Sequence, residues 1–423
     1  MIQPILGGNF NGLATSGTNY GGLMGGEGWA SDPKYFTQVF PIAGTLSNLR
    51  ILLTAAPGVG KSHVFTVMIN GSDTAMVITI SDANTSGNYA GGISISAGDY
   101  VSIKHTSSGT PATAKTAMGV KFDSGVGGAV LVGNRGDSTD VTATEYSGVA
   151  GSGGGWGGTE GDHSQVCPVA GNLQNFRVRL DVAPGAGKSQ TFTIMKNGSA
   201  TAVTVTISDS ATTGADTTHA VAVAAGDKIS VRNTHSGSPA ATPSGWGVEL
   251  DPTIDGESPL CLIQSSGTGI STSSPNYGLP SGNFGDWTGS FNQTFSTTEA
   301  NCRSIAPCDF TWKALYFEVN VAPGSGNSWI ITLRPNGGDS SVTTSIANTA
   351  TAATPDTSNS ASVTDGQTVA LNLTPISGPT AAGRVKIGSV AYVAPAGAAV
   401  ALKRNSTLNG LGASGPFFHN PLG

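Results

Sequence analysis

The feature that most constrains the fold of this chain is a pattern that occurs three times along its 423 residues. In each copy, nineteen residues separate a proline from the second glycine of a PGxG motif, and a further glycine turn follows 38 to 40 residues later. The proline and glycine pairs are Pro41 and Gly60, Pro168 and Gly187, and Pro307 and Gly326. The three PGxG glycines are 127 and 139 residues apart, which is too long for a solenoid repeat. We therefore expect each copy to be a domain with its own core.

The three copies divide the chain into three repeats and a tail. We place their boundaries near residues 126 and 256, which gives a first repeat (1–126), a second repeat (127–256), a third repeat (257–403) and a C-terminal tail (404–423). The third repeat is longer mainly because of an enlarged segment ahead of Pro307.

Strand patterning fills each repeat. In the second repeat Val203, Val205 and Ile207 alternate with Thr204 and Thr206, the pattern of a half-buried strand with one apolar and one hydroxyl face. Each repeat closes on a similar strand, at 117–123, 245–251 and 387–393. No segment has the sustained periodicity of a helix.

Turn residues separate these strands. Asn70-Gly71 predicts a hairpin after the strand at 63–69, because Asn-Gly suits the two positive φ angles of a tight hairpin turn. The glycine turn at 225–227 is interpreted as a second hairpin within the second repeat.

The number of strands in each repeat and the number of repeats predict an all-β protein of three tandem β-sandwich domains. Seven or eight strands in about 130 residues suit a jelly roll of the tumour-necrosis-factor type. Jelly rolls of that type assemble as trimers, so three of them in one chain predict either a covalent pseudo-trimer or separate domains in a row. The short joins between the repeats favour compact packing.

The stretch "APGVGKS" at 56–62 resembles the phosphate loop of nucleotide-binding enzymes. Such a loop starts with glycine where this chain has Ala55, and it opens a helix, whereas the residues that follow here predict a strand. The motif recurs in the other repeats, and the third copy replaces the lysine with Asn327. We interpret all three copies as turns between strands.

Composition limits the classes of partner. Only 11% of the residues are charged and the net charge is −6, without a cluster of lysine and arginine, so we expect no nucleic-acid partner. No apolar run reaches about 18 residues, and the start lacks the pattern of a secretory signal, so we expect no membrane partner and synthesis in a cytoplasm. Cys302 and Cys308 either pair across a loop or stay reduced.

No constellation of residues indicates catalysis. His63 aligns with Gln190 and Trp329 in the other repeats, which favours a structural role. The segment from Asp82 resembles the opening of a calcium loop but has Ile93 where that loop needs a bidentate glutamate. We therefore predict a non-enzymatic protein with no catalytic residues, no metal site and no cofactor.

Aromatic residues are the candidate contact sites. A Gly-rich loop ahead of each proline holds a tryptophan, and a tyrosine precedes the first and third of them: the five residues are Trp29, Trp156, Trp287, Tyr20 and Tyr277. They are either stacking platforms for glycans, plugs for the open end of each sandwich, or contacts between domains. The tail has little strand pattern but contains Phe417 and Phe418, which suggest a docking segment.

The repeats resemble a known group of proteins. The residues at 182–209 ("VAPGAGKSQTFTIMKNGSATAVTVTISD") and 221–240 are similar to repeats in virion proteins of tailed bacteriophages and related environmental sequences. The resemblance implies a structural component on the virion surface, assembled in the host cytoplasm and bound to the major capsid protein or other virion proteins. It implies either a capsid decoration (cement) protein or a fibre or tail accessory protein, the latter binding a receptor or host surface glycans through the tryptophan loops. The enlarged front loop and Asn327 of the third repeat point to a distinct contact there.

Overall fold

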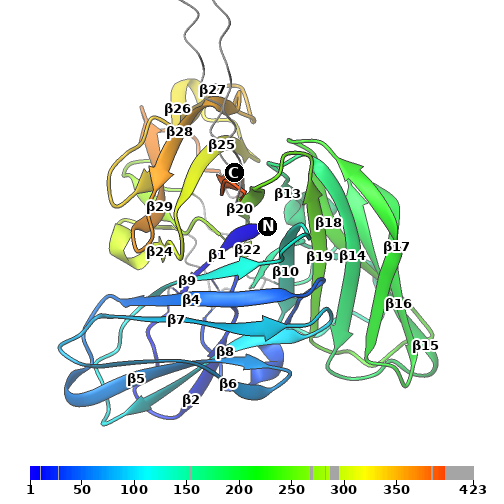
Figure 1. Cartoon of the computed structure of the whole chain (residues 1–423). Coiled ribbons are helices and arrows are strands. Elements are labelled where there is room, and N and C mark those ends of the chain that lie inside the picture. Colours follow the sequence, from blue (N-terminus) through cyan, green and yellow to red (C-terminus); the bar gives the residue numbers. More distant parts are fainter. Residues whose placement is uncertain are drawn as a thin grey trace, which may run out of the picture.

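The computed structural model describes residues 1–9, 11–26, 28–152, 155–266, 270–281, 283–285, 295–382 and 384–395. The fold is all-β, with antiparallel sheets in a sandwich-like arrangement (Figure 1). Among the described residues, helix is confined to α1 (Glu160–His163) and the short 3-10 helices η1 (Pro33–Phe36) and η2 (Glu299–Asn301). None of these is long and apolar enough to cross a membrane.

The first repeat contributes two sheets. Its strands are β1 (Ile2–Asn9), β2 (Thr18–Gly21), β3 (Gln38–Val39), β4 (Gly44–Leu53), β5 (Gly58–Ile69), β6 (Ser72–Asp82), β7 (Ser86–Ile95), β8 (Tyr100–Ser108) and β9 (Thr116–Asp123). One sheet has the order β1-β9-β4-β7, and the other has the order β2-β8-β5-β6 with β3 also paired to β8.

The second repeat repeats this order. Its strands are β10 (Ala129–Arg135), β11 (Glu145–Ser147), β12 (Gly151–Ser152), β13 (Gln165–Val166), β14 (Gly171–Leu180), β15 (Gly185–Lys196), β16 (Ser199–Asp209), β17 (Thr213–Val223), β18 (Lys228–Ser236) and β19 (Ser244–Pro252). Its sheets run β12-β10-β19-β14-β17 and β11-β18-β15-β16, with β13 also paired to β18.

The third repeat has the same arrangement. Its strands are β20 (Glu257–Ser266), β21 (Asn276–Gly278), β22 (Asn283–Gly285), β23 (Phe295–Ser296), β24 (Ser304–Ile305), β25 (Phe310–Val319), β26 (Gly324–Pro335), β27 (Thr343–Asn348), β28 (Asp356–Val363), β29 (Thr368–Ile376) and β30 (Arg384–Tyr392). Its sheets run β22-β20-β30-β25-β28 and β23-β21-β29-β26-β27, with β24 also paired to β29.

The strand predictions are confirmed and one turn prediction is wrong. The alternation at 203–207 is observed in β16, where the three apolar side chains are buried. The Asn-Gly turn joins the paired strands β5 and β6, as expected for a hairpin. The glycine turn at 225–227 does not make a hairpin, because β17 pairs with β14 whereas β18 pairs with β15 in the other sheet. That turn carries the chain from one sheet to the other.

The repeats contact one another in a closed cycle. A short strand of the first repeat packs on the second repeat, one of the second packs on the third, and one of the third packs on the first. At each contact a glycine faces a backbone carbonyl so closely that an added Cβ would lie under 3.0 Å from the oxygen: the pairs are Gly247 with Val39, Gly388 with Val166, and Gly119 with Ile305. Only glycine lets the two backbones approach to this distance.

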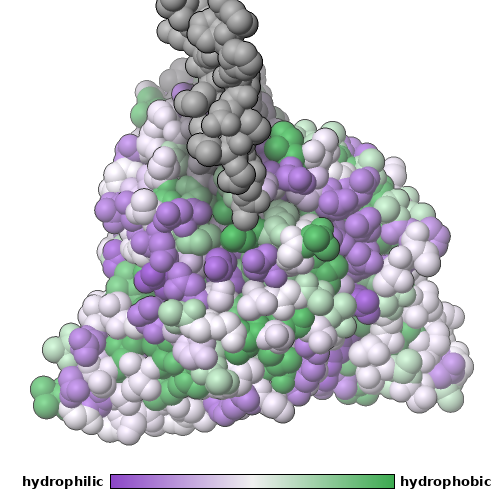
Figure 2. Space-filling view, viewed as in Figure 1, coloured by the Kyte–Doolittle hydropathy of each residue, from purple (hydrophilic) through white to green (hydrophobic). Residues whose placement is uncertain are grey.

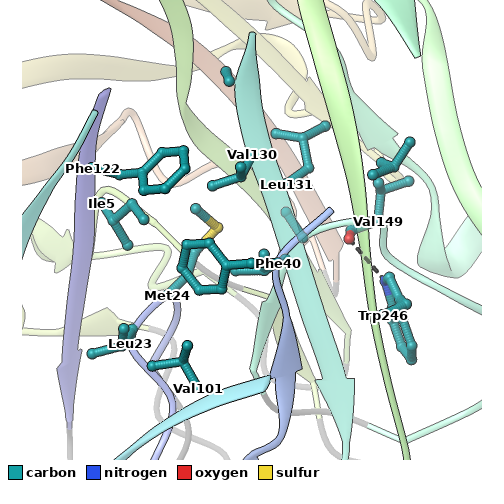
Figure 3. Packing of buried hydrophobic residues seen from close by; sticks show 14 of the residues in the cluster. Ile5, Leu23, Met24, Phe40, Val101, Phe122, Val130, Leu131, Val149 and Trp246 are labelled. Carbon is teal, nitrogen blue, oxygen red and sulfur yellow. Dashed lines mark hydrogen bonds between the residues drawn. The ribbon is translucent and has the colours of Figure 1, made fainter. Parts of the chain in front are cut away.

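One buried cluster joins the first and second repeats (Figure 3). Phe40 and Phe122 of the first repeat pack edge to face with ring centroids 5.3 Å apart, close to Val130 and Leu131 of β10. Trp246 lies deeper in the second repeat, where its indole N–H donates to the carbonyl of Val149 at 2.8 Å. The interface between these repeats is therefore continuous with the cores on either side of it.

The first strands of the three repeats meet in the centre of the molecule. Figure 1 places the labels of β1, β10 and β20 between the three groups of sheets. The carboxamide of Gln3 donates to the Val130 carbonyl at 3.0 Å and accepts from the Val130 N–H at 2.8 Å, which fixes β1 against β10. β20 in turn contacts both β1 and β10.

Candidate functional site

A buried pair of histidines lies between the sheets of the first repeat. His63 on β5 and His105 on β8 are both fully buried, with His63 Nδ1 2.8 Å from His105 Nε2. His63 Nε2 lies 3.0 Å from the carbonyl oxygen of Ala112, which can only accept. His63 therefore carries its proton on Nε2, and its Nδ1 accepts a hydrogen bond from His105.

The two imidazoles are neutral at physiological pH. Burial and, to a lesser extent, the neighbouring His63 together lower the pKa of His105 to about 4. Burial also lowers the pKa of His63, against the hydrogen bond to Ala112. Their hydrogen bonds within the described chain go to each other and to Ala112, so the pair has the partners of a structural unit and not of a nucleophile and its base.

The second repeat builds the same position from amides and a carboxyl group. Gln190, which replaces His63, donates from Nε2 to the carbonyl of Ala240 at 2.9 Å. Asn233, which replaces His105, donates from Nδ2 to Gln190 Oε1 at 3.4 Å and to Glu145 Oε1 at 2.9 Å. Burial raises the pKa of Glu145 to about 8, although the bonds from Asn233 and from the Asp140 N–H lower it. Glu145 is therefore mostly protonated at neutral pH.

The third repeat fills the position with apolar groups. Trp329 on β26 and Leu373 on β29 replace the two histidines, and both side chains are fully buried. The three repeats thus place a histidine pair, an amide and acid set, and an apolar pair at the equivalent position of their respective sheets. What the three sets share is the filling of the sandwich interior.

Two of the predicted tryptophans pack on buried rings of their own repeats. Trp29 packs on Phe65 and on His105, with ring centroids 6.0 and 5.5 Å apart. Trp156, only 5% exposed, packs on Phe192 and Trp246 at 6.0 and 5.3 Å. These contacts lie within one repeat in each case. Trp287 lies outside the described residues, as do Phe417 and Phe418 of the tail.

The predicted tyrosines lie on short strands at equivalent places. Tyr20 on β2 and Tyr277 on β21 are half-buried, and the ring of Tyr277 lies 5.3 Å from the guanidinium of Arg334. The structure adds Tyr146 on β11, which pairs in register with Arg232 as Tyr20 pairs with Lys104. Tyr146 and its neighbour Glu145 were not among the residues predicted from sequence. The residues "EYSG" there, beside "NYGG" and "NYGL" in the other repeats, were the available signal.

The PGxG motifs are turns whose backbone amides already have partners. The Gly60 N–H donates to the Asp82 carboxylate at 2.7 Å, and the Gly187 N–H donates to Asp209 at 2.7 Å. The residues after Gly60 continue as β5, so the strand prediction is confirmed. The part of the chain that the structure describes contains no cluster of three or more metal-ligating side chains, at Asp82 or elsewhere.

The described cysteines are unpaired thiols. Cys302 and Cys308 do not bond to each other, so of the two alternatives the structure has the reduced one. Burial raises the pKa of Cys302, Cys308 and Cys167 to about 12 in each case, which makes them poor nucleophiles.

A charged groove of about 380 Å³ lies between the second and third repeats. Arg384 pairs with Asp162 across it, and Lys228 lies 3.1 Å from Glu318. Lys386, whose pKa burial lowers, donates to Ser164 Oγ at 2.5 Å. The charges of this groove therefore join the two repeats to each other.

No protein-family model matches the chain, and no curated protein matches it.

Proposed function

We propose that the three repeats are tandem jelly-roll domains of the tumour-necrosis-factor type, packed as a covalent pseudo-trimer. In the first repeat the eight longer strands, numbered in chain order without β3, form sheets of order 1-8-3-6 and 2-7-4-5. Two Greek keys folded together give this order. The closed cycle of glycine contacts supports the pseudo-trimer, because each repeat uses the same patch toward the next one. The domain boundaries of this proposal are those given for the repeats.

On this architecture we propose a non-enzymatic structural protein of a tailed-phage virion, and specifically a decoration or cement protein on the outside of the capsid. The observation that carries the proposal is the cyclic packing of three equivalent repeats. Such a body fits a threefold position of a lattice with each repeat facing an equivalent neighbour. A surface with few charges and many hydroxyl side chains suits a protein present in many copies, since each contact can then be weak.

The partners in this proposal are the major capsid protein or other virion proteins. The test is the copy number of the chain per purified virion, measured by quantitative mass spectrometry against the major capsid protein. Hundreds of copies would support a decoration protein. A handful would place the chain in the neck, tail or fibre, and none would refute the virion proposal.

The tryptophan loops give the receptor-binding alternative less support. Stacking on a sugar requires an exposed ring face, and Trp156 is almost fully buried. Glycan-dependent quenching of tryptophan fluorescence that disappears in Trp29→Ala would restore that alternative.

A further inference from the structure

The first join (124–128) and the second join (253–256) between the repeats meet at one end of the central axis. β1 pairs with β9 so that Ile2 lies beside Asp123, and the first join follows at once. Residues of this join, of the second join and of 393–395 line one groove of about 510 Å³ together with Met1. All three repeats contribute to this axis-end face, which we define by the groove residues and by Ile254.

The axis-end face presents apolar side chains to solvent. Val126 in the first join is fully exposed and Ile254 in the second join is 55% exposed. Pro395 occupies the corresponding place after the third repeat and is also exposed. Five other large apolar side chains are exposed on the described surface. Val126 and Ile254 lie in and beside one groove that all three repeats line, and this shared position marks the face as a contact surface. Figure 2, seen in the same direction as Figure 1, shows hydrophobic and hydrophilic patches side by side around the centre.

The charged side chains of the axis-end face are all acidic. The charged side chains that line the groove are Asp123, Asp251 and Asp255. The ammonium group of Met1 lies in the same groove, where it donates to the Gly125 carbonyl and lies 3.6 Å from Asp123. A second copy of this chain docked head to head would bring six carboxylates together. The charge pattern instead complements a partner with apolar groups surrounded by lysine or arginine.

We propose that the axis-end face is the surface by which the chain docks onto a protein lattice, at a local threefold position that presents apolar side chains within a basic rim. The proposal rests on the proposed virion function and adds to it the face, its orientation and the chemistry of the partner. The axis of the pseudo-trimer then stands perpendicular to the lattice, and the far ends of the sandwiches point away from it.

The test uses the full chain and phage particles assembled without it, with binding measured by co-sedimentation. Val126→Glu and Ile254→Glu should each weaken binding at least about tenfold, because they place a charge in the apolar contact. The matched control is Val59→Glu. Val59 is 89% exposed and lies beyond the end of β4 that is opposite to Asp123, so this variant should bind as wild type does. Unchanged circular dichroism would show that the variants fold.

The outcomes separate the two proposals. If Val126→Glu and Ile254→Glu both bind as tightly as the wild type, the docking face is overturned and the virion function stands. A wild-type chain that binds no particles would overturn the virion function and its lattice partner together. The expected result is that the two axis-end variants lose binding and Val59→Glu does not. The wild type should also bind more weakly in 1 M salt than in about 0.1 M salt.

Discussion

Replacing Glu145 with glutamine should change the pH dependence of stability in a predictable way. Glu145 is 5% exposed, and burial raises the pKa of its carboxyl group from an ordinary value of 4.5 to about 8 in the folded chain. Between these two values the unfolded chain has released the proton and the folded chain keeps it. The wild type is therefore most stable, with respect to this group, below pH 4.5, and it loses stability as the pH rises towards 8.

The size of the effect follows from the two pKa values. The interval from 4.5 to about 8 corresponds to about 5 kcal/mol of folding free energy once the pH exceeds 8, or about 1.4 kcal/mol per pH unit within the interval. Glu145→Gln removes the titrating group and keeps an oxygen that accepts from Asn233 and from the Asp140 N–H. The variant should match the wild type near pH 4.5 and exceed it by several kcal/mol at pH 8.

The assay is urea denaturation, followed by tryptophan fluorescence, at intervals from pH 4.5 to 8.5. The difference between variant and wild type isolates Glu145, because the other titrating groups contribute to both chains. Gln190→Leu is the control: it changes the same interior set without a titrating group, so it should lower stability by a similar amount at every pH. A flat difference curve for Glu145→Gln would refute the assignment of a protonated carboxyl group.

Three further results are expected. The wild type should lose up to about 3 kcal/mol of stability as the pH falls from 6.5 through about 4, because burial keeps His105 neutral in the folded chain only. His105→Asn should abolish this loss, as measured by denaturation at pH 4 to 7. Gly247→Ala should lower the free energy of unfolding by about 3 kcal/mol or more, because its Cβ would lie 1.9 Å from the Val39 oxygen. Gly187→Ala, where φ is 70° and the space is open, should lower it by about 1–2 kcal/mol in the same thermal denaturation experiment. Lys61→Ala should leave the melting temperature nearly unchanged, and ATP binding that this variant abolished would contradict the turn assignment.

The strands could be predicted from sequence because their signals are local. Alternation along 203–207 and the turn residues Asn70-Gly71 depend only on the residues themselves and their neighbours. The turn at 225–227 has equally good local chemistry, but the sheet that the next strand joins is decided by packing far along the chain. A crossover between sheets and a hairpin therefore look alike in sequence, and this turn was assigned wrongly.

The interior set of the second repeat could not be predicted for a related reason. Glu145 lies on a strand of three residues, which is too short to show alternation. Its environment comes from Asn233, 88 residues further along the chain. A glutamate in a glycine-rich region is ordinarily a solvated side chain, and only the pairing of β11 with β18 buries it.

The repeats differ in their interiors and agree in their mutual contacts, and this difference has a physical reason. An interior position accepts any set of side chains that fills the space and satisfies its polar groups, so His63, Gln190 and Trp329 can occupy one place. At the contacts between repeats a backbone carbonyl lies where a Cβ would be, and no rotamer or hydrogen bond relieves a clash with backbone. Glycine is therefore required at all three contacts. If the pseudo-trimer is what the chain uses to meet its partner, substitutions at these glycines should abolish binding even where each sandwich still folds, whereas exchanges among the interior sets should change stability and leave binding intact.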